Sequence, residues 1–98
     1  MKKELNAYDI NQITIDSCLT SSLFYKIKIV FKYDRVIVYQ RFKSSDRFYW
    51  IASFARGVIF NSDSLTEFIE DINNRLFLFL MPEDIEKSVN RLTKRRKQ

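Results

Sequence analysis

The alternation of apolar and polar residues is clearest between Tyr25 and Tyr33. The odd positions of this stretch are Tyr25, Ile27, Ile29, Phe31 and Tyr33, and the even positions are Lys26, Lys28, Val30 and Lys32. A period of two places successive side chains on opposite faces of a strand. The pattern predicts a half-buried strand whose lysines lie on the face away from the core.

Three further stretches have strand character. Arg35 to Phe42 follows so closely that only a tight turn around Tyr33 and Asp34 can join it to the first strand. Lys43 to Asp46 has turn composition, and Arg47 to Phe54 then predicts a strand rich in aromatic residues. Arg56 and Gly57 separate it from a short strand, Val58 to Phe60. These stretches predict a four-stranded antiparallel meander.

Helical spacing begins at Ser64, where Ser64 to Glu67 has the form of a capping box. The apolar residues Leu65, Phe68, Ile69, Ile72 and Leu76 recur at helical intervals, and the helix is expected to run on through Phe77 to Leu80. Pro82 suits the first turn of a second, short helix with Ile85, Val89 and Leu92 on one side. The predicted fold class is α+β, a meander followed by an amphipathic helix and a short C-terminal helix.

The N-terminal segment, residues 1–23, fits two interpretations. Ile10, Ile13, Leu19 and Leu23 would suit a helix, whereas Ile13 and Ile15 would suit a strand. With 98 residues the chain has the size of one domain. We expect a single domain over residues 1–93, with its N-terminal element undecided, and a basic tail over 94–98.

The composition is that of a globular protein, with 46% hydrophobic and 30% charged residues. The single cysteine, Cys18, cannot form an internal disulfide, and no secretory leader pattern is present. These features predict a reducing intracellular compartment, cytoplasmic or nucleoid-associated. The longest apolar run, Leu76 to Met81, is much shorter than the roughly 20 residues of a membrane-spanning helix, so no membrane association is expected.

Several residue types that catalysis commonly uses are rare or absent. The chain has no histidine, one cysteine and one glycine, which excludes the usual zinc sites, a P-loop and a dinucleotide fingerprint. Glu67, Glu70 and Asp71 lie in the predicted helix at the spacing of a solvated face. We therefore expect a binding protein that is not an enzyme, with no metal, no cofactor and no small-molecule substrate.

Charge is unevenly distributed along the chain. Residues 24–56 carry a net charge of +6 and residues 91–98 one of +5, while residues 57–90 carry −5. A turn at Tyr33 and Asp34 would place Lys26 opposite Arg41 and Lys32 opposite Arg35, and like charges directly opposite destabilise a sheet. A polyanion bound on this face would relieve the repulsion. A solubilising face that discourages edge aggregation is an equally good explanation of the charges alone.

Aromatic residues favour the polyanion. Eleven of the fifteen lie between Phe24 and Phe60, among lysines and arginines. The alternation assigns Phe31, Trp50 and Phe54 to the core phase, whereas Tyr39 and Tyr49 fall in the opposite phase, where their rings would stack with unpaired bases. Exposed base faces exist only in single strands, so the pattern predicts a protein that binds single-stranded nucleic acid.

Two motifs resemble the single-stranded-DNA-binding transcriptional coactivators typified by positive cofactor four. Phe31-Lys32, a short turn and Arg35-Val36-Ile37 resemble the first hairpin of that family, and Arg56-Gly57-Val58-Ile59-Phe60 resembles the strand that leads into its helix. The resemblance covers roughly residues 24–80 and implies homodimers that bind melted or single-stranded DNA in transcription regulation. It makes Lys32, Arg41, Trp50 and Arg56 candidate contacts, so that Trp50 has two possible roles, core or ligand.

The chain also departs from the family pattern. Its turn is one residue longer, Phe54 and Ala55 replace the usual proline and glycine, and the helix has an apolar extension. Six consecutive apolar residues from Leu76 exceed what one protomer's core can bury from a helix, which independently predicts a homodimer.

The candidate nucleic-acid-binding residues combine the charge, aromatic and family arguments. They are Lys26, Lys28, Lys32, Arg35, Tyr39, Arg41, Arg47, Tyr49, Trp50 and Arg56. The main alternative is a small protein-binding inhibitor or interaction module of a mobile element or phage, because aromatic residues and arginine are also enriched at protein interfaces. RNA binding is a third possibility, since the sequence contains no signal for or against recognition of a 2′-hydroxyl.

Overall fold

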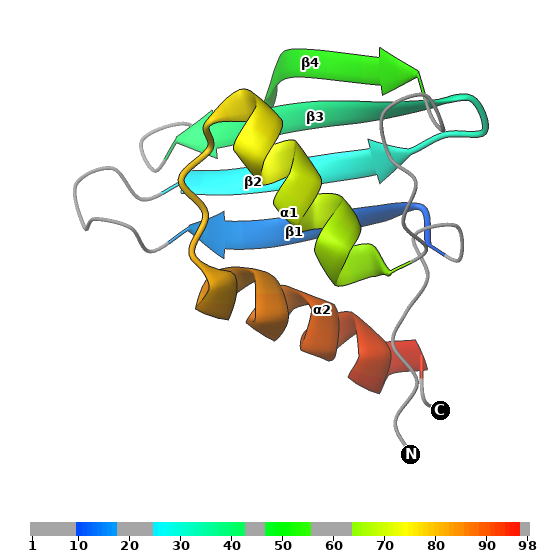
Figure 1. Cartoon of the computed structure of the whole chain (residues 1–98), viewed down its shortest axis with the longest axis vertical. Helices are drawn as coiled ribbons and strands as arrows, with labels where there is room; N and C mark the ends of the chain where they lie inside the picture. Colours follow the sequence, from blue (N-terminus) through cyan, green and yellow to red (C-terminus); the bar gives the residue numbers. More distant parts are fainter. Residues whose placement is uncertain (1–9, 18–24, 43–46, 56–63, 97–98) are drawn as a thin grey trace.

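The computed structural model describes residues 10–17, 25–42, 47–55 and 64–96. It contains one four-stranded antiparallel sheet in the order β1-β2-β3-β4, followed by two helices (Figure 1). The elements are β1 (Gln12–Ser17), β2 (Tyr25–Phe31), β3 (Arg35–Phe42), β4 (Tyr49–Ala55), α1 (Leu65–Leu76) and α2 (Pro82–Arg96). The predicted α+β class and its antiparallel meander are confirmed.

The central hairpin, β2 and β3, forms as its alternation predicts. Tyr33 and Asp34 make the turn, and the amide of Lys32 donates a hydrogen bond of 2.9 Å to the carbonyl oxygen of Arg35. Lys26 pairs with Arg41, Lys28 with Tyr39 and Val30 with Ile37, in the predicted register. The apolar positions of both strands, Ile27, Ile29, Phe31, Val36 and Val38, are buried on the other face.

The first strand of the sheet comes from the segment that fitted both a helix and a strand. In β1, Ile13 and Ile15 are buried and lie opposite Ile29 and Ile27 of β2. The segment forms a strand and not a helix, because a period of two places both isoleucines on the apolar face of the sheet. The predicted strand from Val58 to Phe60 and the predicted turn from Lys43 to Asp46 lie outside the described residues.

A register shift in the β3–β4 pair decides against the core, one of the two roles predicted for Trp50. The pairing is irregular between Val38 and Tyr39, so Trp50 lies opposite Tyr39 and Tyr49 lies opposite Gln40. An extra residue in one strand moves the side chains beyond it to the other face. Trp50 was assigned to the core phase, but its side chain is 62% exposed.

Helix α1 covers one face of the sheet (Figure 1). Ser64 caps its N-terminus, with its hydroxyl accepting a hydrogen bond from the amide of Glu67 at 3.4 Å, as the capping box predicts. The side chains of Leu65, Phe68, Ile69 and Ile72 are buried against the sheet. Phe68 meets Phe31 of β2 edge to face, with ring centroids 5.4 Å apart.

Helix α1 ends earlier than its apolar sequence predicts. Phe77 adopts the left-handed conformation (φ 54°) and closes the helix at Leu76, so the expected continuation through Leu80 is wrong. The side-chain amide of Asn73 donates to the carbonyl oxygen of Leu80 (3.1 Å) and accepts from its amide (2.9 Å), which fixes the connection to α2. Leu78 and Leu80 are buried, while Phe77 and Phe79 are exposed.

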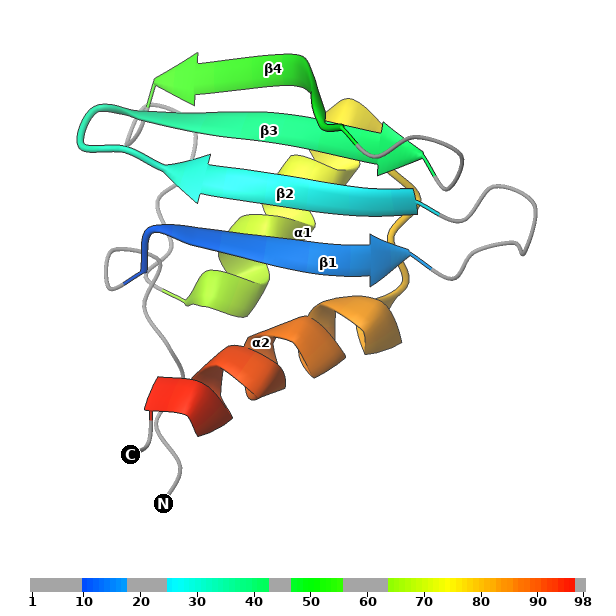
Figure 2. The same cartoon turned by 180° about the vertical axis from the view of Figure 1, so that it is seen from behind.

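Helix α2 lies beside β1, at one edge of the sheet (Figures 1 and 2). It begins at Pro82 as predicted and buries Ile85 and Val89. With 15 residues it is longer than the 12-residue α1, so the prediction of a short helix is corrected. Lys94, Arg95 and Arg96 belong to its last turn, although they were assigned to a tail. No described element covers the sheet face opposite α1, called the open face below (Figure 2).

Candidate nucleic-acid interface

The open face carries a compact group of predicted site residues from the two central strands. Lys26 and Lys28 of β2 lie opposite Arg41 and Tyr39 of β3. All four are partly exposed, because their strands turn Ile27, Ile29 and Val38 toward α1 instead. The alternation that builds the core therefore also gathers these cations and a ring on one surface.

Phe48, just before β4, lies close to two of these cations. The ammonium of Lys28 is 4.4 Å from the centre of the Phe48 ring, and the guanidinium carbon of Arg41 is 5.3 Å from it. Lys28 also lies 5.1 Å from the centre of the Tyr39 ring. Both cations lie within the distance at which an aromatic ring attracts a positive charge. Sequence reasoning missed Phe48, whose only signal is its place in the basic, aromatic-rich segment.

Carboxylates lie beside the like-charged pairs that the sequence predicted. Asp16 of β1 forms an ion pair of 3.0 Å with Lys26, and Asp34 lies 3.9 Å from Arg35. Each predicted pair therefore has one member near a negative charge, which lowers the repulsion that a bound polyanion would have to relieve. Lys28 and Arg41 differ, since neither makes an ion pair with a described residue.

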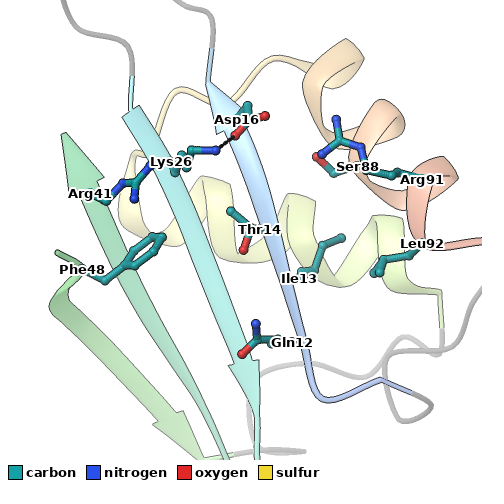
Figure 3. A pocket seen from close by; sticks show the side chains of 10 residues that line it. All are labelled: Gln12, Ile13, Thr14, Asp16, Lys26, Arg41, Phe48, Ser88, Arg91 and Leu92. Atoms are coloured by element: carbon teal, nitrogen blue, oxygen red, sulfur yellow. Dashed lines mark ion pairs between the residues drawn. The ribbon is translucent and has the colours of Figure 1, made fainter. Parts of the chain in front are cut away.

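An open pocket of about 450 Å³ extends from this surface toward α2 (Figure 3). It is lined by Gln12, Ile13, Thr14, Asp16, Lys26, Arg41, Phe48, Ser88, Arg91 and Leu92. Figure 3 shows Thr14 of β1 between the sheet side of the pocket, with Arg41 and Phe48, and the helix side, with Arg91 of α2. Three of the lining side chains are cations, and one carboxylate partly neutralises them.

The structure brings together only part of the predicted site. Lys26, Lys28, Tyr39 and Arg41 share the open face, and Trp50 joins them as the cross-strand neighbour of Tyr39. Lys32 and Arg35 lie apart at the turn of the hairpin. Tyr49 lies opposite Gln40, in the phase that faces α1, so its predicted place on the face away from the core is wrong. Arg47 is exposed just before β4. Arg56 lies outside the described residues.

Across the described parts of the chain, no three or more Cys, Asp or Glu residues are grouped so that they could hold a metal ion. Neither of the two described helices has the length and apolar character of a membrane span. Comparisons with models of protein families, with curated proteins and with solved structures found no match.

Proposed function

We propose that this protein binds single-stranded nucleic acid on the open face of its sheet, with single-stranded DNA as the favoured ligand and no catalytic step. The observation that carries this proposal is the contact of Lys28 and Arg41 with the Phe48 ring. Cations supply phosphate contacts, and rings beside them supply stacking surfaces for bases. A sheet surface that carries both cations and rings can therefore bind both the phosphates and the bases of a single strand.

The lack of described carboxylate partners makes Lys28 and Arg41 the main phosphate contacts. A cation that is already paired gains less from a phosphate, because it must share or give up its existing partner. Lys26, which is paired with Asp16 at 3.0 Å, is thus a weaker contact than its neighbour Lys28. Lys32 and Arg35 lie at the hairpin turn and would contact a strand that extends beyond the central surface.

DNA is favoured over RNA by the resemblance to the coactivator family, which also supports a role in transcription regulation. The pattern of cations and rings itself fits both nucleic acids, because it addresses phosphates and base faces, which both have. A duplex is disfavoured, since its stacked bases offer no free faces to Phe48 or Tyr39.

A homodimer is a second part of the proposal. The segment between the helices exposes Phe77 (76%), Phe79 (65%) and Met81 (40%), all from the apolar run that predicted dimerisation. Large exposed apolar side chains grouped in one segment favour a protein contact. The same residues also favour the alternative, in which this protein is an interaction module that binds a different protein. Light scattering at micromolar concentration separates a dimer from a monomer.

A titration with labelled ligands tests the binding proposal. Oligodeoxythymidylate and oligouridylate of about 12 nucleotides, a DNA duplex of equal length and heparin are each titrated with the purified protein at two salt concentrations. We expect the single strands to bind more tightly than the duplex, with log affinity falling linearly with log salt. Equal binding of all four polyanions would indicate an unspecific basic surface, and no binding would favour the protein-interaction alternative.

A further inference from the structure

The pocket of about 450 Å³ joins the open face to a second basic element, helix α2. We propose that this pocket holds one nucleotide unit of the bound strand, and that the strand continues from the sheet across β1 onto the C-terminal half of α2. The inference rests on the proposed function, and it adds a defined subsite and a path that the sheet alone does not supply.

The size and shape of the pocket fit a nucleotide. Sites for small ligands commonly have volumes of about 300 to 1,000 Å³, and this pocket lies in the lower part of that range. Figure 3 shows that β1 crosses it, with Thr14 near its centre. The side chains of Gln12 and Thr14 make no hydrogen bond to another described residue, so both can bind a ligand.

Two arginines line the pocket from opposite sides. Arg41 reaches it from β3 and Arg91 from α2 (Figure 3). Neither arginine makes an ion pair with a residue that the structure describes, whereas Lys26 in the same pocket is paired with Asp16. Guanidinium groups bind phosphate oxygens in a bidentate manner, so each of these side chains is suited to hold a phosphate on its own side of the pocket.

Phe48 supplies the third part of a nucleotide site. Its ring lines the pocket on the sheet side and contacts Arg41 and Lys28. A base placed in the pocket would have an aromatic surface beside the cations that hold its phosphate. Base stacking on an aromatic side chain tolerates any sequence, which fits a pocket with few groups able to read base edges.

The C-terminal half of α2 extends the same positive surface. Lys94 follows Arg91 by three residues, a spacing that places two side chains side by side on a helix, and it is exposed. Because α2 lies beside β1 (Figure 2), a strand that leaves the sheet across β1 would reach this part of the helix, with Arg91 and Lys94, next.

The test uses matched arginine variants of the full chain. Arg91→Gln removes the pocket cation of α2, and Arg75→Gln removes an exposed arginine of α1, which covers the opposite face of the sheet. Both lower the net charge by one, and Arg41→Gln reports on the sheet surface. Binding of labelled oligodeoxythymidylate is measured over a series of salt concentrations, and thermal melting checks that each variant folds.

We expect Arg91→Gln and Arg41→Gln each to reduce the slope of log affinity against log salt by about 0.7, the value for one phosphate contact on a single strand. Arg75→Gln should leave the slope unchanged. Lys94→Gln is a second variant outside the pocket, and it should also weaken binding if the strand follows α2.

Three results would overturn the subsite. If Arg41→Gln weakens binding but Arg91→Gln behaves like Arg75→Gln, the strand stays on the sheet, and the proposed function survives alone. If Arg75→Gln weakens binding as much as Arg91→Gln, binding follows net charge without a subsite. If the unmodified protein fails to bind the oligonucleotide, the proposed function and the subsite both fail.

Discussion

The ammonium of Lys28 in β2 lies 4.4 Å from the centre of the Phe48 ring, although the two residues are twenty positions apart in the sequence. Arg41 contacts the same ring from β3 at 5.3 Å. Each such contact contributes roughly 0.5 to 1 kcal/mol at an exposed site. The ring thus holds two cations in place on the open face, and it ties the segment before β4 to the central hairpin.

Replacing Phe48 tests whether its ring contributes to binding. We expect Phe48→Ala to weaken the binding of a single-stranded oligonucleotide by about 1 to 3 kcal/mol, because a stacking surface is lost while no charge is removed. The slope against log salt should change little. Fluorescence anisotropy titrations at several salt concentrations measure both quantities.

Tyr49→Ala is the matched control for Phe48→Ala. Tyr49 is the next aromatic residue along the chain, but it lies opposite Gln40 in the phase that faces α1. Its loss should leave oligonucleotide binding nearly unchanged. Equal losses for the two variants would mean that bases do not discriminate between the two faces of the sheet.

Removing the negative charge of Asp16 should strengthen binding. Asp16 pairs with Lys26 at 3.0 Å, so Asp16→Asn frees that lysine for a phosphate and removes a repulsive charge from the pocket. We expect tighter oligonucleotide binding and a salt slope steeper by up to about 0.7. The pair is partly exposed, with side chains 31% and 34% accessible, and solvent screening keeps the contribution of such pairs small, so the melting temperature should change little. Weaker binding by Asp16→Asn would contradict this role for Lys26.

Neighbouring residues of β2 test the assignment of the two faces. Ile29 is fully buried in the core, whereas Val30 lies on the open face and is only partly buried. Ile29→Ala should lower the free energy of unfolding by about 2 to 5 kcal/mol. Val30→Ala should cost clearly less, since it leaves a smaller gap at a partly exposed site. Chemical denaturation measures both values, and the reverse order would mean that the faces are exchanged.

The backbone at Phe79 offers a test of the connection between the helices. Phe79 has a positive φ of 60°, which a residue with a Cβ atom adopts at a cost of roughly 1 to 2 kcal/mol. Phe79→Gly and Phe79→Ala both remove the exposed ring, but only glycine avoids that cost. We therefore expect the glycine variant to be more stable than the alanine variant by about 1 kcal/mol in denaturant titrations. A glycine variant that is less stable than the alanine variant would exclude the left-handed conformation.

The central hairpin was predictable because its signal is long and local. Alternation over β2 and a turn of two residues leave one register that buries Ile27 and Ile29 together with Val38. Strand β1 was harder to predict, since two isoleucines in six residues suit a strand and the surrounding residues also suit a helix. Pairing with β2, a long-range contact, decides between the two.

The core phase that the alternation gave Trp50 and the helical continuation expected at Phe77 were wrong for different physical reasons. A one-residue irregularity in the β3–β4 pair reverses the phase of Trp50, and nothing in the alternation of β4 itself marks that position. At Phe77 the apolar sequence continues, but the backbone leaves the helix because the Asn73 side chain binds Leu80 in place of a further turn. Phe48 was missed because it has the phase of Trp50 and Phe54 within the predicted strand Arg47 to Phe54, and that phase was assigned to the core. Its role depends on cations from two other strands.

Amide chemical-shift mapping tests the proposed binding surface most directly. The isotope-labelled protein is titrated with oligodeoxythymidylate, and the perturbed residues are located on the structure. We expect the largest shifts at Thr14, Lys28, Tyr39, Arg41 and Phe48 on the open face, with small shifts along α1. Shifts confined to α1 or to the segment from Phe77 to Met81, or none at saturating oligonucleotide, would contradict it.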